Sequence, residues 1–272
     1  MRSHFAGDRL QKQYLLGLSE DLSIAETPRW AIQVSLSTAN PSMLELFKAC
    51  FQGYGKVGKY PTFSPHTGYY WRTYLCLDRS FEFMIESKRD YGFESLSDSE
   101  FFSRLAGLID AEGSILIVKN HKHIGRSVVI GNETKELINE TWRRLSKLGY
   151  HPNRYAYRRR GEASFVGNLK TSYRRTLWAV TLNRKKEVET LLERVQLRNE
   201  HKILKASFLN ESLKLTLWDS IKTRLGCLKS QVASETSKSR EMARVEFLKK
   251  NQSRRILNIL TAFSLIFASL LK

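Results

Sequence analysis

Hydrophobic residues near the middle of the chain recur every three or four positions, which is the spacing of an amphipathic helix. This pattern follows a Ser/Asp-rich entry at 97–99 and stops at Gly113. The next segment, 114–118, reads Ser-Ile-Leu-Ile-Val, which is typical of a buried strand. We therefore predict a helix that ends beside Gly113 and leads directly into a strand. The apolar positions of the helix are Phe101, Phe102, Leu105, Leu108 and Ile109.

Small side chains occupy one side of the same predicted helix. Ala106, Gly107 and Ala111 would let a second helix approach closely, because the distance between crossing helices depends on side-chain size. Glu112 falls in the last turn, where the helix dipole disfavours a negative charge. From the residues alone, Glu112 is either a cation ligand or an ordinary solvated glutamate at a helix end.

The segment after this helix alternates twice between a pair of strands and one helix. Gly149 ends the first of these helices. The predicted elements are strands at 114–119 and 126–131, a helix at 133–148, strands at 154–160 and 174–182, and a closing helix at 186–195.

The first half of the chain repeats this plan. Tyr14-Leu-Leu-Gly-Leu18 parallels Arg104-Leu-Ala-Gly-Leu108, and Leu77-Asp-Arg79 parallels Leu182-Asn-Arg184. The corresponding predicted elements are a strand at 29–38, a helix that opens at 40–43, strands at 58–63 and 70–77, and a closing helix at 81–87.

A unit of this kind can bury only one face of its sheet under its own helices. We therefore predict an α+β fold of two pseudo-symmetric αββαββα repeats, which pack through their first helices and form a saddle of β-ribbons. The repeats span 1–95 and 96–200. Helical patterns continue through 201–272, which we interpret as a basic C-terminal extension that ends in an apolar segment.

Positive charge is concentrated in the second repeat. The chain carries a formal net charge of +18, which favours a polyanionic partner. Residues 119–186 hold 17 Lys and Arg against 4 Asp and Glu, whereas residues 12–94 hold 9 of each sign. The second repeat is therefore expected to supply most of the salt-dependent affinity for such a partner.

Other features of the sequence exclude several classes of protein. The three cysteines form no CxxC pair and have no histidine at ligand spacing, so neither structural zinc nor a disulfide framework is indicated. Residues 256–271 are strongly apolar but short for a membrane span, which needs about 20 residues. We interpret this tail as a packing or interaction helix, with a membrane anchor as the alternative. A reducing compartment fits, either the cytoplasm of a prokaryote or an organellar matrix.

The nine residues Leu105-Ala-Gly-Leu-Ile-Asp-Ala-Glu-Gly113 resemble the motif that names the LAGLIDADG family of homing endonucleases, with Glu112 in place of the usual aspartate. The resemblance to the single-chain form of that family covers roughly residues 12–200. It implies a site-specific DNA endonuclease that acts in intron homing as a pseudo-symmetric monomer on double-stranded DNA. It also implies Mg²⁺ or Mn²⁺, because in this family each motif helix supplies one metal-binding acid.

Glu112 fills the acidic position of the second motif, and Asp110 is interpreted as structural. The first motif departs from the pattern, because the position equivalent to Glu112, counted from Gly17, is Leu22. Asp21 stands one residue early, and an unbroken helix would turn it about 100° away. If one residue is missing after Leu18, Asp21 becomes the second ligand, with Glu20 as the alternative.

The resemblance further implies a basic residue close to the scissile phosphate, near the end of the last strand. Arg184, Lys185 and Arg79 are the candidates, although each could instead cap or solvate the adjacent helix.

Groups suited to reading DNA follow the predicted strands, since a β-ribbon fits the major groove. Period-two alternation allows only about half of them to face it. The candidates are Lys119, Lys122, His123, Arg126, Arg154, Tyr155, Tyr157, Arg158, Arg159, Arg160, Arg174 and Arg175 in the second repeat, and Arg29, Gln33, Lys59 and Arg72 in the first.

Two other functions remain open at this point. The degenerate first motif would also suit a binder that does not cleave, such as an RNA-splicing maturase with host intron RNA as a partner. One working acid would give a nickase.

Overall fold

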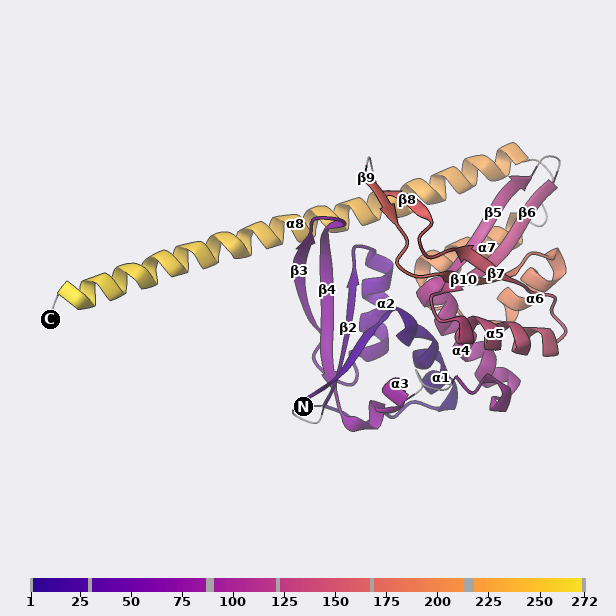
Figure 1. The fold of residues 1–272 in the computed structure, drawn as a ribbon, viewed down its shortest axis with the longest axis horizontal. Helices are drawn as coiled ribbons and strands as arrows, with labels where there is room; N and C mark the ends of the chain where they lie inside the picture. The colour runs from indigo at the N-terminus through magenta and orange to yellow at the C-terminus, as the bar shows by residue number, and fades with distance from the viewer. Residues whose placement is uncertain are drawn as a thin grey trace.

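A computed structural model describes residues 2–28, 31–86, 91–120, 123–166, 169–212 and 218–270, without the side chains at 120, 123, 164–166, 169, 170, 219, 220 and 254–270. The predicted α+β class with two repeats is confirmed. Figure 1 shows the two sheets side by side, with α1 (Arg9–Leu18) and α4 (Asp98–Glu112) between them.

The first repeat follows α1 with a short 3₁₀ turn, η1 (Ser19–Asp21), before its first strand. The closing helix begins at Phe83, later than the predicted 81, because a 3₁₀ turn takes up the beginning of the segment; residue 87 lies outside the described part of the chain. The remaining elements are β1 (Ser23–Thr27), β2 (Ala31–Thr38), α2 (Pro41–Phe51), β3 (Gly58–Ser64), β4 (Gly68–Leu77), η2 (Arg79–Phe81) and α3 (Phe83–Glu86).

The second repeat begins with α4, preceded by η3 (Phe93–Ser95). A capping box fixes the start of α4: the Ser97 side chain accepts the backbone N–H of Glu100, and the Glu100 side chain accepts that of Ser97. The next elements are β5 (Gly113–Asn120), β6 (His123–Asn132), α5 (Lys135–Lys147), β7 (Asn153–Arg158), β10 (Leu177–Leu182) and α6 (Lys185–Arg194).

The two sheets have the same topology. Their strand orders are β1-β2-β4-β3 and β5-β6-β10-β7, all antiparallel, so in each repeat the last strand lies between the second and third. Residues paired across strands share a face. Ile32, Val34, Leu75 and Leu77 line the covered face of the first sheet and belong to the core. The opposite face of each sheet, here called the open face, has no helix layer of its own repeat.

One hairpin was not predicted. Between β7 and β10 the chain forms β8 (Ala163–Val166) and β9 (Leu169–Ser172), which pair only with each other. The predicted strands at 154–160 and 174–182 are therefore shorter, and their arginine-rich ends lie outside the sheet.

The C-terminal extension forms two helices, α7 (Glu200–Ser212) and α8 (Trp218–Leu270). Buried Phe208, Leu209 and Ile221 join it to the main core. Farther along α8, Ala243 packs on Leu44 and Trp71 of the first repeat. The helix thus runs past both sheets and continues beyond β3 (Figure 1).

Among the residues that the structure describes, we find no helix with the length and apolar character needed to cross a membrane. The side chains of the predicted apolar tail, 256–271, lie outside the described part of the chain.

Candidate active site and nucleic-acid surface

The two motif helices cross at a pair of glycines. A Cβ atom on Gly17 would lie 2.0 Å from the backbone O of Arg104 and 2.7 Å from the backbone N of Leu108. A Cβ on Gly107 would lie 2.1 Å from the O of Tyr14 and 2.8 Å from the N of Leu18. The contacts are reciprocal in the register that aligned the two motifs, so α1 and α4 are related by pseudo-twofold symmetry about this crossing.

Asp110 is a buried structural acid at the crossing of α1 and α4, here called the seam. The Tyr14 hydroxyl donates to Asp110 Oδ2 at 2.6 Å, and the backbone N–H of Arg198 donates to the same oxygen at 2.7 Å. Burial raises the pKa of Asp110 above its usual range, although these hydrogen bonds act in the opposite direction. The structural role predicted for Asp110 agrees with this position.

Glu112 and Asp21 stand at corresponding ends of the two motif helices. Glu112 is the last residue of α4, and Gly113 behind it packs against the backbone of Ile109. On the other side, α1 ends at Leu18 and the chain tightens into η1, whose last residue is Asp21. The α-helix is thus broken before Asp21, so the rotation expected of an unbroken helix does not apply.

These two carboxylates interact. The protein packed around the Glu112 carboxylate raises its pKa to about 7, and repulsion from Asp21 and Glu20 adds to the rise. Burial likewise raises the pKa of Asp21 to about 6. Both residues are exposed overall, although protein surrounds their carboxylates. Glu20 lies on the flank of the pair, where Asn132 Nδ2 donates to Glu20 Oε2 at 3.3 Å.

The donor set fits a hard divalent cation. Mg²⁺ takes oxygen ligands and is typically held by one or two carboxylates, together with water and substrate phosphate. In the described residues no group of three or more His, Cys, Asp or Glu is placed to hold a metal ion. Asp21 and Glu112 would therefore share a metal with oxygens from outside the protein, which is the arrangement that a phosphodiester substrate provides.

A cation that the sequence did not predict lies beside these acids. Lys202, in the first turn of α7, donates through Nζ to the backbone O of Gly113. Burial and Lys205 lower the pKa of Lys202 to about 8, whereas Asp110, Glu112 and Asp21 act to raise it. No motif or spacing marks Lys202 within the basic extension, since its place depends on how α7 folds back on the seam.

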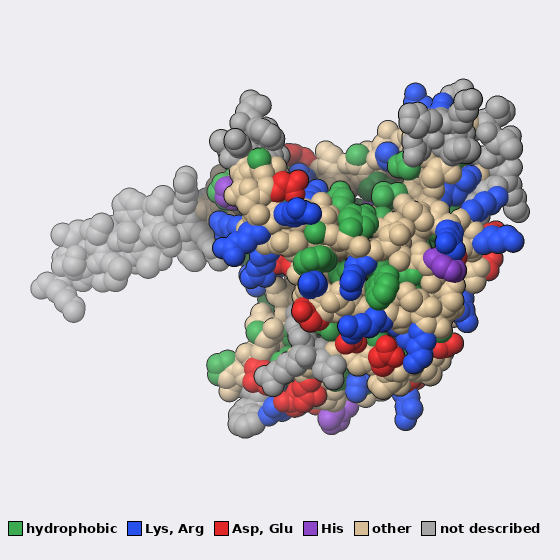
Figure 2. Space-filling model, turned by 45° about the vertical axis from the view of Figure 1, so that its right-hand side comes forward, with side chains coloured by type: hydrophobic (Ala, Val, Ile, Leu, Met, Phe, Trp, Pro, Cys, Tyr) green, Lys and Arg blue, Asp and Glu red, His purple; other side chains and the backbone are tan. Residues whose placement is uncertain are grey.

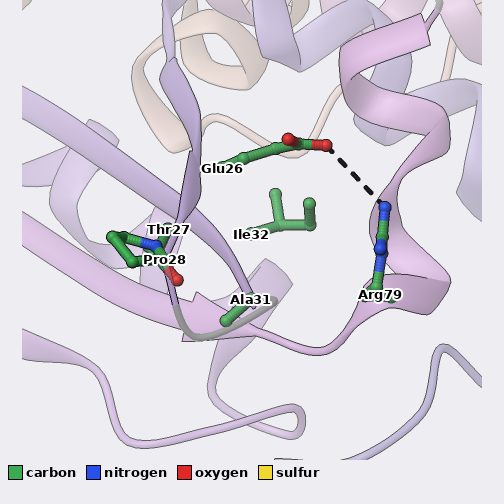
Figure 3. Close-up of a pocket in the computed structure, with 6 residues that line it drawn as sticks. All are labelled: Glu26, Thr27, Pro28, Ala31, Ile32 and Arg79. Carbon is green, nitrogen blue, oxygen red and sulfur yellow. Dashed lines mark ion pairs between the residues drawn. The ribbon is translucent and has the colours of Figure 1, made fainter.

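The three basic residues predicted near the scissile phosphate make local ion pairs or remain at the surface. Arg79 points toward Glu26 across a hollow beside β1 and β2 (Figure 3), with 3.9 Å from Nη2 to Glu26 Oε1 and 2.6 Å to Glu82 Oε1. Arg184 precedes α6, and its Nη1 lies 3.4 Å from Glu187 Oε1. Lys185 is the exposed first residue of α6.

Four of the predicted DNA-reading residues share the open faces. Gln33 pairs with Cys76, and Arg72 pairs with Tyr60 and Ser37, so Gln33 and Arg72 lie opposite the core. In the second sheet Tyr155 and Tyr157 are exposed, with ring centroids 6.5 Å apart. Figure 2 shows blue Lys and Arg side chains interspersed with green hydrophobic ones on the surface turned to the reader. Exposed open-face residues that the sequence did not single out are Tyr74, Leu116 and Val118.

Four others lie on the covered faces. Lys59 Nζ stacks 3.8 Å from the ring centroid of Trp71, and the Arg154 guanidinium lies 5.0 Å from that of Trp142. Arg126 donates to the side chain and backbone of Ser212, and Lys119 lies near Trp218. Period-two alternation separates these residues from the open face, because each pairs across the sheet with a residue of the helix-covered side.

The arginines predicted on the second hairpin gather around β8 and β9 instead. Arg158 lies 4.9 Å from the ring centroid of Tyr173, and Arg175 Nη1 lies 2.8 Å from Glu133 Oε2. Arg159, Arg160 and Arg174 are exposed. Of the remaining candidates, Arg29, Lys122 and the side chain of His123 lie outside the described residues.

Residues 101–196 match the family model described as a LAGLIDADG-like domain. No curated protein matches the chain. Solved structures similar to it include variants of the homing endonuclease I-DmoI (16% identity, 72% of this chain and 97% of that chain, TM-score 0.49) and I-WcaI bound to its DNA recognition sequence (16%, 69% and 81%, 0.46). A third is I-GzeII in complex with a DNA target (10% identity, 85% and 97%, 0.45). Residues 101–196 therefore match the LAGLIDADG-like domain that the motif at Leu105–Gly113 indicated.

Proposed function

We propose that this protein is a site-specific endonuclease that hydrolyses both strands of double-stranded DNA with Mg²⁺ or Mn²⁺. The observation that carries the proposal is the meeting of Asp21 and Glu112 at the ends of two reciprocally crossed helices, between two open sheet faces. One chain supplies both acids, so the active form is a monomer.

The acids would bind the metal, which activates water and neutralises the oxygen that departs from phosphorus. Asp21 and Glu112, when ionised, would hold the ion between the two repeats. The open faces would hold the duplex on either side, with Gln33, Arg72 and the paired tyrosines Tyr155 and Tyr157 toward the groove. Residues that contact only phosphate would add affinity without sequence information.

A cleavage assay tests the proposal directly. Duplexes that the protein retains in Ca²⁺ are first selected from a randomised double-stranded library and cloned into a supercoiled plasmid. The plasmid is then treated in Mg²⁺ with wild type, Glu112→Gln and Asp21→Asn. We expect linear product from wild type, and neither variant should produce it while both keep their affinity for the duplex.

Two outcomes would replace the proposal. Nicked circles that disappear only with Glu112→Gln would identify a nickase in which Asp21 takes no part. Selection of tightly bound duplexes that are never cut would favour a binding protein. The comparisons give no support to host intron RNA as a partner, and a matched RNA arm of the selection would test the maturase alternative.

A further inference from the structure

Lys202 reaches the acid pair from outside the two repeats. It belongs to α7 of the C-terminal extension, and its Nζ donates to the backbone O of Gly113, the residue that follows Glu112. The side chain is half-buried, although lysine usually keeps its ammonium in water. A lysine withdrawn from water in this way needs compensating partners.

The chain just before α7 is fixed to both repeats. The backbone N–H of Arg198 donates to Asp110 Oδ2 at 2.7 Å in the second repeat. In the first repeat, the Ser42 hydroxyl donates to Asn199 Oδ1 and also accepts the backbone N–H of His201 at 3.4 Å. These contacts set the start of α7 across the seam, so the position of the ammonium does not depend on the Lys202 side chain alone.

The ammonium interacts with three carboxylates, those of Asp21, Glu112 and Asp110. Asp21 and Glu112 repel each other, and each is stabilised in its ionised form by Lys202. The positive charge of Lys202 offsets the repulsion between the two carboxylates, and without a cation this repulsion would push them apart.

We propose that Lys202 is a positioning residue: it holds Asp21 and Glu112 together before a metal binds, and a divalent ion then takes over that charge. The extension is thereby a working part of the cleavage site. This inference rests on the proposed function for the identity of the acids, but it concerns the protein without DNA.

The alternative is that Lys202 only ties α7 to the end of α4 through Gly113. The two roles predict opposite responses to metal. If Lys202 offsets carboxylate repulsion, a divalent ion should stabilise the protein without Lys202 more than it stabilises wild type. If it is only a tether, its removal disorders the site and lowers its affinity for the metal. The metal should then stabilise the variant less than wild type, because a ligand stabilises the folded state more when it binds more tightly.

The experiment compares wild type with Lys202→Met, Lys202→Arg and Lys205→Met, all without DNA. Lys205 is the matched control: it is half-buried on the same helix, and the charges that interact with it are the cations Lys202 and Lys229 rather than the acid pair. Thermal unfolding is recorded in EDTA and in saturating Mn²⁺ at a pH between the pKa of Glu112, about 7, and that of Lys202, about 8. We expect Lys202→Met to have the lowest Tm in EDTA and to gain at least about twice the Mn²⁺ shift of wild type, whereas Lys202→Arg and Lys205→Met behave as wild type.

A double-mutant cycle with Glu112→Gln completes the test. In the Glu112→Gln background, most of the Tm difference that Lys202→Met causes should disappear, because the effects of coupled residues are not additive. An Mn²⁺ shift in Lys202→Met no larger than that of wild type, or a loss of Tm unchanged in the Glu112→Gln background, would overturn the inference. If wild type cuts no duplex, the proposed function fails, yet these Tm measurements still decide the role of Lys202.

Discussion

Gly17 and Gly107 each lie against the backbone of the other's helix, at the point where α1 and α4 cross. A Cβ on either would come within 2.1 Å of a carbonyl oxygen, so the helices could approach this closely only with glycine at both positions. The acid pair depends on this crossing, because Glu112 and Asp21 follow these glycines by five and four residues along their chains.

Gly107→Ala and Gly17→Ala should therefore destabilise the protein to a similar degree. Overpacking of a close contact costs about 1–3 kcal/mol, and the gain in helix propensity offsets less than about 1 kcal/mol of it. Urea unfolding measures the change. Gly226→Ala in α8 is the matched control, since its Cβ would meet nothing within 4 Å and should leave the protein equally or more stable. Equal stability of all three variants would contradict the crossing.

Loss of the Tyr14 hydroxyl should destabilise the protein, because buried Asp110 would lose a hydrogen-bond donor. Tyr14→Phe removes a donor 2.6 Å from Asp110 Oδ2, and an under-satisfied buried acceptor costs about 1–3 kcal/mol. Tyr150→Phe is the control, because the buried Tyr150 hydroxyl has no hydrogen-bond partner in the described structure. We expect the free energy of unfolding to fall for Tyr14→Phe and to stay level or rise for Tyr150→Phe.

The raised pKa of Glu112 makes stability depend on pH in a defined direction. Between its ordinary pKa near 4.5 and its folded pKa of about 7, the folded state holds a proton that the unfolded state has released. Stability from this group is thus present at pH 4.5 and is lost as pH rises to 7. Glu112→Gln should be more stable than wild type at pH 8 and equal to it near pH 4. Solvent screening at this exposed residue limits the gain to roughly 1 kcal/mol, a Tm shift of about 2–4 °C.

Calorimetry without metal at pH 4 and pH 8 provides the measurement, with Glu193→Gln, an exposed glutamate on α6, as control. A Glu112→Gln advantage that is the same at both pH values would show that the shift has another origin. Since metal ligands must be ionised, metal affinity of wild type should also rise as pH passes through 7.

One pair of substitutions can distinguish the contributions of the open and covered faces to DNA binding. Arg72→Ala removes an exposed cation opposite the core and should weaken binding to a selected duplex, with a salt dependence lower by about 0.9 in slope if it contacts one phosphate. Lys59→Ala removes the same charge from the strand next to it, but from the face where Lys59 covers Trp71. Fluorescence anisotropy across a salt series compares them. An equal loss for both would mean that only net charge matters.

Much of the architecture could be predicted from local sequence. The spacing of Leu105, Leu108 and Ile109, the break at Gly113 and the Ser97 entry determined α4 and β5, because these signals act over a few residues. The parallel between Tyr14–Leu18 and Arg104–Leu108 determined the two repeats, and the register it implied is the register of the Gly17–Gly107 contact. The small residues Ala106, Gly107 and Ala111 predicted a close helix crossing without identifying the partner helix.

Other features were decided only by tertiary structure. The sequence left Asp21 and Glu20 as alternatives, and the 3₁₀ turn at Ser19–Asp21 places both carboxylates where they raise the pKa of Glu112, Asp21 more than Glu20. Strand alternation was clear, but the choice of face for Lys59 and Arg154 depended on which helices covered each sheet. Lys202 lies 90 residues beyond Glu112 in the chain, and no short-range pattern links them. The physical reason is common to all three: helices and strands follow from neighbours in sequence, whereas the environment of a charge depends on groups that folding alone brings within a few ångströms.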